Sequence, residues 1–293
     1  MKVERLAMAA YLLAFFAFLL GPLAVLSVTA FNTASYPAVT PFEGFTWQWF
    51  GQLLQDDAIL YGLQNSLRIG LFVVALSVPL GLAGAMVMTQ IDARARGLYY
   101  LVVVSPVLTP GVIIGISTVV FWRDMTGLTG TRFLYNGTVL TVLGQSSFIA
   151  AYCMLVFLSR LQRFDATLEE AALDLGASRA QVFRHILLPF LRPAVFSAAV
   201  LAFLASFENY NTTTFAILAD KTLTTVLAGR VRQGVSPSVS ALAVLIIAVT
   251  AAGAVLVELV RLRQRGVQRQ AARASARAEA AEMLPALPEA KRA

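Results

Sequence analysis

Long runs of apolar residues, separated by shorter polar segments, dominate the chain. A helix needs about 20 mostly apolar residues to cross a bilayer. Glycine and proline inside such runs do not exclude helices, because neighbouring groups in a membrane protein satisfy the freed backbone. The pattern therefore predicts an all-α membrane protein with six transmembrane helices. We expect them over residues 6–31, 67–91, 97–122, 139–159, 193–207 with an extension toward 218, and 238–260.

The first apolar run has two interpretations. Lys2 and Arg5 precede it, and Val28-Thr29-Ala30 loosely resembles a cleavage site, so the run could be a secretory signal peptide. Its apolar part spans about 25 residues, whereas the apolar region of a signal peptide has about 7–15. This length favours a membrane helix that stays with the protein.

Composition and charge agree with a membrane location. Hydrophobic residues make up 58% of the chain and charged residues 13%, against about 45–50% and about 25% in soluble domains. Of the 23 Lys and Arg residues, 17 lie in the N-terminus, the loops 92–96 and 160–192 and the segment after 260. Cytoplasmic segments carry such an excess, so both termini are predicted to be cytoplasmic and the net charge of +7 reflects topology rather than nucleic-acid binding. The single Cys excludes a disulfide framework within the chain and a multi-cysteine metal site.

The long loop between the fourth and fifth predicted spans carries the most informative pattern. Thr167 stands three residues before Glu170, as in a capping box that starts a helix. Four apolar residues follow at the spacing of one helix face, and Gly176 is a typical helix stop. Ser178 can then cap a second short helix, after which Pro189 marks the exit toward the membrane. The apolar face of the first helix comprises Leu168, Ala171, Ala172 and Leu175.

A short amphipathic helix with small residues at its centre suits insertion into a groove on a partner protein. Glu170 and Asp174 could pair with charges beside such a groove. A helical hairpin lying on the membrane surface fits the same pattern equally well. The residues by themselves therefore leave both interpretations open.

The same loop resembles the EAA signature of the membrane subunits of binding-protein-dependent ABC importers. Glu170-Ala171-Ala172 is followed after three residues by Gly176, and after nine more by Ile186-Leu187-Leu188-Pro189. In that family the loop couples the permease to its ATPase, and we therefore name residues 160–192 the coupling loop. The resemblance implies contact with an ATPase through Glu170, Ala171, Ala172, Asp174, Gly176, Ile186, Leu188 and Pro189.

The resemblance extends over roughly residues 10–260 and is closest to the second permease subunit of spermidine/putrescine-type importers. It implies the six-helix fold of type I ABC importer permeases, with a permease domain over 1–265 and a basic cytoplasmic tail, disordered or helical, over 266–293. Permeases for iron, thiamine and other small solutes share parts of the pattern. The motifs that carry it are Phe31-Asn32, Gly44-Phe45-Thr46 with Trp49, Asn65-Ser66-Leu67, Ser105-Pro106 and Gly234-Val235-Ser236-Pro237.

The resemblance also implies a set of partners. They are an ABC ATPase dimer, a second permease subunit, favoured to be a different chain, a periplasmic solute-binding protein and the lipid bilayer. ATP would bind to the ATPase, so no cofactor is expected on this chain, which lacks the phosphate-binding pattern G-x-x-x-x-G-K-[S/T]. We expect a multi-pass protein of the bacterial inner membrane that is not itself an enzyme. It would translocate a polyamine or related organic cation by alternating access.

Glu208 interrupts the fifth predicted span, which makes that span the weakest of the six. An acidic residue at membrane depth is costly and often functional. Glu208, Asn209, Tyr210 and Asn211 could line a path for a cationic solute, with the Tyr210 ring offering a cation–π face. Alternatively, Glu208 lies at the outer interface or pairs with a basic residue of a second subunit. Polyamine-type relatives commonly carry paired acidic residues here, whereas Asn209 follows Glu208 in this chain, which leaves a smaller or less charged cation open.

Three other functions are weaker alternatives. A secondary transporter or channel that works without ATP is the runner-up, although the spans lack the carboxylate ladder of a proton relay. A scaffold that recruits a partner through its basic tail is the third, but basic residues just after a span are expected from topology. An enzyme is least expected, because His185 has no Ser, Cys or Asp arrangement around it.

Overall fold

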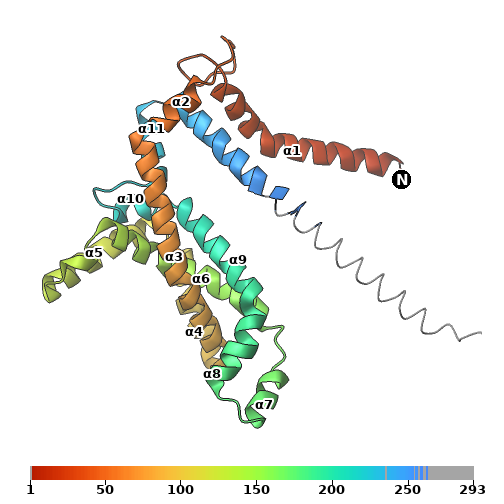
Figure 1. Ribbon diagram of the computed structural model, residues 1–293, viewed down its shortest axis with the longest axis vertical. Helices are drawn as coiled ribbons and strands as arrows, with labels where there is room; N and C mark the ends of the chain where they lie inside the picture. Colours follow the sequence, from red (N-terminus) through yellow and green to blue (C-terminus); the bar gives the residue numbers. More distant parts are fainter. Residues whose placement is uncertain (1, 235, 254, 257, 260–261, 263–293) are drawn as a thin grey trace, which may run out of the picture. The chain divides into compact units, whose positions relative to one another are not determined.

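The computed structural model describes residues 2–234, 236–253, 255–256, 258–259 and 262, and within them the regular structure is helical (Figure 1). The chain divides into two units, one formed by Met1–Leu53 with the residues from Ser236 on, the other by Leu54–Val235. The helices of the first unit are α1 (Lys2–Ala30), most of α2 (Gln48–Leu54) and the helix Pro237–Gly253. Those of the second are α3 (Asp57–Gln90), α4 (Ala93–Leu108), α5 (Gly111–Thr129), the 3₁₀ turn Arg132–Leu134, α6 (Gly137–Leu161), α7 (Thr167–Asp174), α8 (Arg179–Val182), the π turn Phe183–Leu187, α9 (Leu188–Phe207), α10 (Thr213–Ala216) and α11 (Leu223–Gln233).

Within the described residues, five helices are long and apolar enough to cross a membrane, which confirms the prediction of an all-α membrane protein. The helix Pro237–Gly253 has 17 residues in its described part and lies where the sixth span is expected. The six-span count and the cytoplasmic termini stay predictions. The tail predicted over 266–293 lies outside the described residues. The five helices are Glu4–Ala30, Asp57–Gln90, Gly111–Thr129, Gly137–Leu161 and Arg179–Phe207.

The third expected span, over 97–122, is not one helix, and this prediction was wrong. α4 ends at Leu108 and α5 begins at Gly111, with Thr109 in an extended conformation between them (φ −84°, ψ 131°). The residue before a proline is pushed out of the helical region by the proline ring, and Pro110 follows Thr109. The break at Thr109-Pro110 therefore turns one apolar run into two helices.

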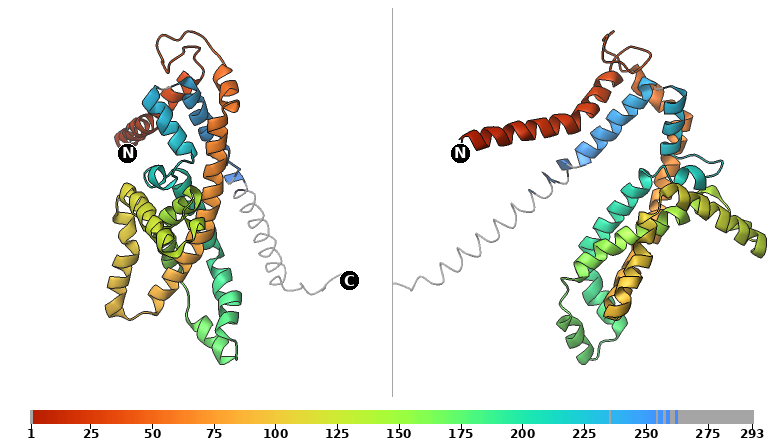
Figure 2. Two further views of the ribbon diagram at one scale, coloured as in Figure 1. Left: turned by 90° about the vertical axis from the view of Figure 1, so that its left-hand side faces the viewer. Right: turned by 180° about the vertical axis from the view of Figure 1, so that it is seen from behind.

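Three long helices, α3, α6 and α9, pack against one another and form the core of the second unit (Figures 1 and 2). Their contact depends on small residues. A Cβ atom added to Gly81 of α3 would lie 2.8 Å from the carbonyl oxygen of Ala150 on α6, so the two backbones touch there. Close backbone approach at small residues is the usual packing of membrane helices. The buried residues that line this core include Ile69, Val73, Ala85, Ile149, Cys153, Met154, Phe157, Leu191, Ala194, Ala198 and Ala202.

The Asn65-Ser66 pair fastens the segment before α11 to α3. The Asn65 amide donates to the carbonyl of Lys221 over 2.7 Å, and the Ser66 hydroxyl accepts from the backbone N–H of Leu223 over 2.9 Å. An ion pair between Arg230 of α11 and Asp56, the N-cap residue of α3, adds a third attachment. The motif noted in the sequence thus has a packing role.

In the first unit, Asn32 organises the chain that leaves α1. Its buried side chain donates to the carbonyls of Ala38 and Pro41 and accepts from the backbone N–H of Glu43 over 3.0 Å. Its own carbonyl accepts from the indole N–H of Trp49 over 2.7 Å. The Phe31-Asn32 motif and Trp49 therefore stabilise one local structure.

Gly81→Ala tests the contact between α3 and α6. We expect the thermal midpoint of the purified protein in detergent to fall, because inserting a methyl group into a closed contact costs roughly 1–3 kcal/mol. Gly97→Ala is the matched control, since nothing lies within 4 Å of a Cβ added to Gly97. Equal midpoints for the two variants would contradict the close packing.

Candidate functional site

α7 is capped by Asp165, not by the capping box predicted for Thr167 and Glu170. The Asp165 carboxylate accepts a hydrogen bond from the Thr167 hydroxyl over 2.8 Å and one from the Thr167 backbone N–H over 3.0 Å. Thr167 therefore occupies the first helical position instead of the cap position. The same two bonds, the hydroxyl first, hold the pKa of Asp165 below its ordinary value, because they stabilise the carboxylate.

Gly176, which follows the C-cap residue Leu175, terminates α7 as predicted. This residue has a φ of +85°, in the left-handed region that favours glycine. Its N–H donates to the carbonyl of Leu173 over 2.9 Å, and the next N–H, of Ala177, donates to Ala172 over 3.0 Å. The pair of bonds is a Schellman motif, which satisfies the last carbonyls of the helix. The prediction for the cap of the second helix is also confirmed, because Ser178 and Gln181 form a capping box.

The second short helix is not separate from the membrane span that follows it. α8, the π turn and α9 form one continuous helix, Arg179–Phe207, so the exit predicted at Pro189 was wrong. In the π turn the N–H of Leu188 reaches back five residues to the carbonyl of Phe183. Proline lacks an N–H and its ring crowds the carbonyl four residues earlier, and a widened turn next to Pro189 accommodates both effects. Ile186, Leu188 and Pro189 lie half-buried along this helix.

The apolar side of α7 is uncovered in this chain. Leu168 is 53% exposed and Leu175 is 89% exposed, and α7 contains no buried residue. Glu170, Ala171 and Asp174 are also exposed. A shallow groove joins this side of α7 to α8, and it is lined by Ala172, Leu175, Gly176, Ala177, Gln181, Val182, His185 and Ile186. Figure 1 shows α7 and α8 together at one end of α9.

The residues predicted to line a solute path begin at the other end of the continuous helix Arg179–Phe207. Glu208 is the C-cap residue of α9, and its side chain is exposed. The side-chain oxygen of Asn209 accepts from the backbone N–H groups of Thr212 and Thr213, both over 3.2 Å, and so caps α10. The Tyr210 hydroxyl accepts from Arg232 over 2.9 Å. Asn209 and Tyr210 are therefore engaged in local structure, while Glu208 and Asn211 are exposed.

A buried chain of hydrogen bonds, which was missed in the sequence, connects this end of α9 to α6. Ser206 of α9 donates to the amide oxygen of Gln145 over 2.5 Å. The amide nitrogen of Gln145 donates to the Thr213 hydroxyl over 2.8 Å, and that hydroxyl donates to the carbonyl of Asn209 over 2.8 Å. Gln145 is 1% exposed, within a long apolar span. A single glutamine in an apolar run was the available signal, because a buried polar group in a membrane helix requires partners.

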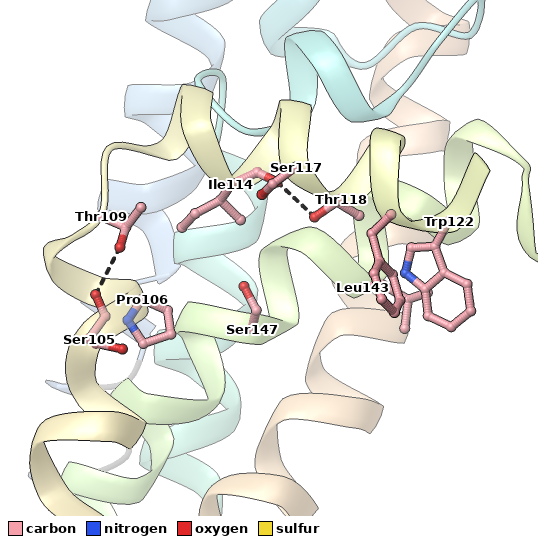
Figure 3. Close-up of a pocket in the computed structure, with 10 residues that line it drawn as sticks. Ser105, Pro106, Thr109, Ile114, Ser117, Thr118, Trp122, Leu143 and Ser147 are labelled. Carbon is pink, nitrogen blue, oxygen red and sulfur yellow. Dashed lines mark hydrogen bonds between the residues drawn. The ribbon is translucent and has the colours of Figure 1, made fainter. Parts of the chain in front are cut away.

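A pocket of about 580 Å³ between α4, α5 and α6 was also missed (Figure 3). Its lining combines serine and threonine hydroxyls with apolar and aromatic side chains, and we name it the hydroxyl pocket. Figure 3 shows Ser117 and Thr118 of α5 above Ser147 of α6, with Trp122 at one side. Of these lining residues, only Ser105-Pro106 belonged to a motif that the sequence indicated. The other hydroxyl residues are single positions in apolar spans, without a distinctive spacing. The hydroxyl residues are Ser105, Thr109, Ser117, Thr118 and Ser147.

This arrangement of helices is the fold of ABC importer permeases. The chain resembles a chain of a bacterial ABC transporter involved in the import of the acidic polysaccharide alginate, with a TM-score of 0.66 and 20% identity over 87% of this chain and 94% of that one. A second structure, of a bacterial alginate ABC transporter in complex with an alginate pentasaccharide-bound periplasmic protein, gives the same TM-score at 18% identity, over 87% of this chain and 92% of that one. The fold class predicted from the sequence is confirmed.

Residues 77–266 match the model of the family described as binding-protein-dependent transport system inner membrane component, and the chain belongs to this family. The putrescine transport system permease protein PotI of Escherichia coli K12 is 33% identical over 79% of this chain and 82% of that protein. The spermidine/putrescine transport system permease protein PotC of Haemophilus influenzae is 28% identical over 86% and 95%. The protein is thus an inner-membrane permease subunit of a bacterial ABC importer, as the EAA signature predicted.

The capping of α7 by Asp165 can be tested by measuring hydrogen exchange as a function of pH. A carboxyl group whose pKa is lowered by folding stabilises the structure above its unfolded pKa, and this contribution is lost as the pH falls through the folded pKa. We expect the Thr167 amide to become less protected from hydrogen exchange as the pH falls below about 4, after correction for intrinsic exchange rates. Asp165→Asn keeps a neutral acceptor like that of the protonated carboxyl, so it should show the weaker, low-pH level of protection at every pH, and Asp165→Ala should lack the protection throughout. Equal protection in Asp165→Ala and the unmodified chain would contradict the cap.

Proposed function

We propose that this chain is one of two permease subunits of a polyamine importer. An ABC ATPase dimer supplies the energy and a periplasmic binding protein delivers the solute. The solute proposal is supported by the relatives, whose names state putrescine or spermidine/putrescine transport. The second permease is a different chain in this proposal. ATP binds to the ATPase subunits, since the chain carries no phosphate-binding loop pattern.

The observation that carries the coupling role is the uncovered apolar side of α7. Leaving Leu168 and Leu175 in water is unfavourable, and burial of a leucine side chain contributes about 1.5–3 kcal/mol. Ala171 and Ala172 allow close approach, so α7 can enter a groove on an ATPase subunit in the manner of other helix-in-groove contacts. Glu170 and Asp174, both exposed, offer charge partners at the edge of that contact.

The continuous helix Arg179–Phe207 gives a physical route from the ATPase to the solute path. Its 29 residues span about 43 Å at the 1.5 Å rise of an α-helix. Movement of α8 with α7 therefore displaces the far end of the same continuous helix. That far end holds Ser206, whose bond to Gln145 transfers the displacement to α6. Closure of the ATPases thus rearranges α6 and α9 together, which provides alternating access.

Ala172→Arg tests the coupling contact. The arginine would fill the groove between α7 and α8 and block docking, so solute-stimulated ATP hydrolysis by the assembled importer should fall about tenfold or more, the effect of about 1.4 kcal/mol. Gln162→Arg is the control, because it adds the same charge to the coupling loop at an exposed position outside α7 and α8. Membrane insertion of both variants is checked by fractionation. Unchanged stimulation in a correctly inserted Ala172→Arg importer would exclude the proposed coupling.

The solute is tested in proteoliposomes that contain the complete importer and its binding protein. We expect ATP-dependent accumulation of radiolabelled putrescine or spermidine. Iron, thiamine and amino acids should not accumulate under the same conditions. Accumulation of one of these instead would identify a permease of the same family for another solute, and uptake that follows an ion gradient without ATP would indicate a secondary transporter.

A further inference from the structure

We propose that the hydroxyl pocket binds an ammonium group of the solute during its passage through the permease. This inference rests on the proposed function, because it assigns a site to the cationic solute. The pocket lies between α4, α5 and α6 (Figure 3). Its volume of about 580 Å³ falls within the roughly 300–1,000 Å³ of small-molecule sites.

The hydroxyl groups of the pocket are all oriented as acceptors. The Ser117 and Thr118 hydroxyls donate to the carbonyl of Ile114, over 3.1 and 2.7 Å. The Ser147 hydroxyl donates to Gly144 over 2.7 Å, and those of Ser105 and Thr109 likewise donate to carbonyls of the preceding turn. A hydroxyl has one proton and two lone pairs. With each proton committed to its own helix, the oxygens can accept further bonds but not donate them.

The charge and aromatic character of the lining point to the same ligand. None of the ten lining side chains is acidic or basic, so no fixed charge repels a cation or holds it permanently. The rings of Phe121 and Trp122 meet edge to face, 5.3 Å apart, and both line the pocket. An aromatic face attracts an ammonium group by about 0.5–2 kcal/mol. Hydroxyl acceptors and aromatic rings together suit a cation that must be released again, since a transport site has to bind weakly enough to let its ion leave.

The break between α4 and α5 lies at the edge of this pocket. Thr109, which lines the pocket, is the extended residue before Pro110, and the helices on both sides are apolar. Non-helical backbone at membrane depth is stable only where protein covers it or where it lines a water-filled cavity. Ser117 and Ser147 are exposed in this chain, so the pocket has an open side. A hydrated path along α5 accounts for the break and the exposed hydroxyls together.

The decisive variant is Ser117→Lys in the complete importer, assayed for putrescine import in proteoliposomes. A fixed ammonium group in the pocket should lower the maximal import rate by more than about tenfold, because like charges repel strongly in a partly desolvated site. The half-saturating putrescine concentration should stay unchanged, since it depends on the affinity of the periplasmic binding protein for putrescine. Ser159→Lys is the matched control. Ser159 lies on α6 outside the pocket, and its hydroxyl donates to the preceding turn in the same way, over 2.8 Å.

Ser117→Ala combined with Ser147→Ala decides the question if the lysine variant does not assemble. This double variant removes two acceptors and adds no charge, and we expect a several-fold lower maximal import rate with normal assembly on size-exclusion chromatography. Normal import by the double variant would overturn the site, as would a lysine variant that assembles and imports normally. The proposed function is tested separately by the unmodified importer and the Ser159→Lys control. If both import another solute but not putrescine, the polyamine function is rejected, whatever the result for the hydroxyl pocket.

Discussion

The direct contact between the backbones of α3 and α6 at Gly81 supports the rest of the second unit. Lipid supplies no hydrophobic drive to hold membrane helices together, so stability comes from van der Waals contact at small residues and from buried hydrogen bonds. α9 completes the three-helix core with a buried series of alanines, at positions 194, 198 and 202. The coupling loop and the hydroxyl pocket are both attached to these helices, so their geometry depends on that packing.

The helix Arg179–Phe207 connects the coupling loop to the contact with α6. Its first turns belong to the coupling loop, and its last turn holds Ser206 against Gln145. A buried polar contact of this kind fixes the relative position of two helices, because an unpaired amide in an apolar interior is costly. One continuous helix therefore joins the coupling loop to α6.

Local sequence determined much of the coupling loop. The left-handed residue Gly176 and the cap at Ser178 are local features, since glycine alone adopts a positive φ without strain and serine caps a helix within three residues. The EAA signature identified the family for the same reason, because its residues are close together in the chain. The cap at Asp165 was missed because a threonine followed three residues later by a glutamate has the pattern of a capping box, whereas in the structure the Thr167 hydroxyl donates to Asp165.

What the sequence by itself determined was the helical membrane character, the family, the stop of α7 at Gly176 and the cap of α8 at Ser178. The tertiary structure decided that α8 continues through Pro189 into α9, that Asn209 caps α10, and that hydroxyls from three helices form one pocket. Apolar periodicity and caps act over a few residues and can be read along the chain. Helix continuity through a proline and the convergence of Ser117 with Ser147 depend on packing between segments distant in sequence, which no local pattern encodes.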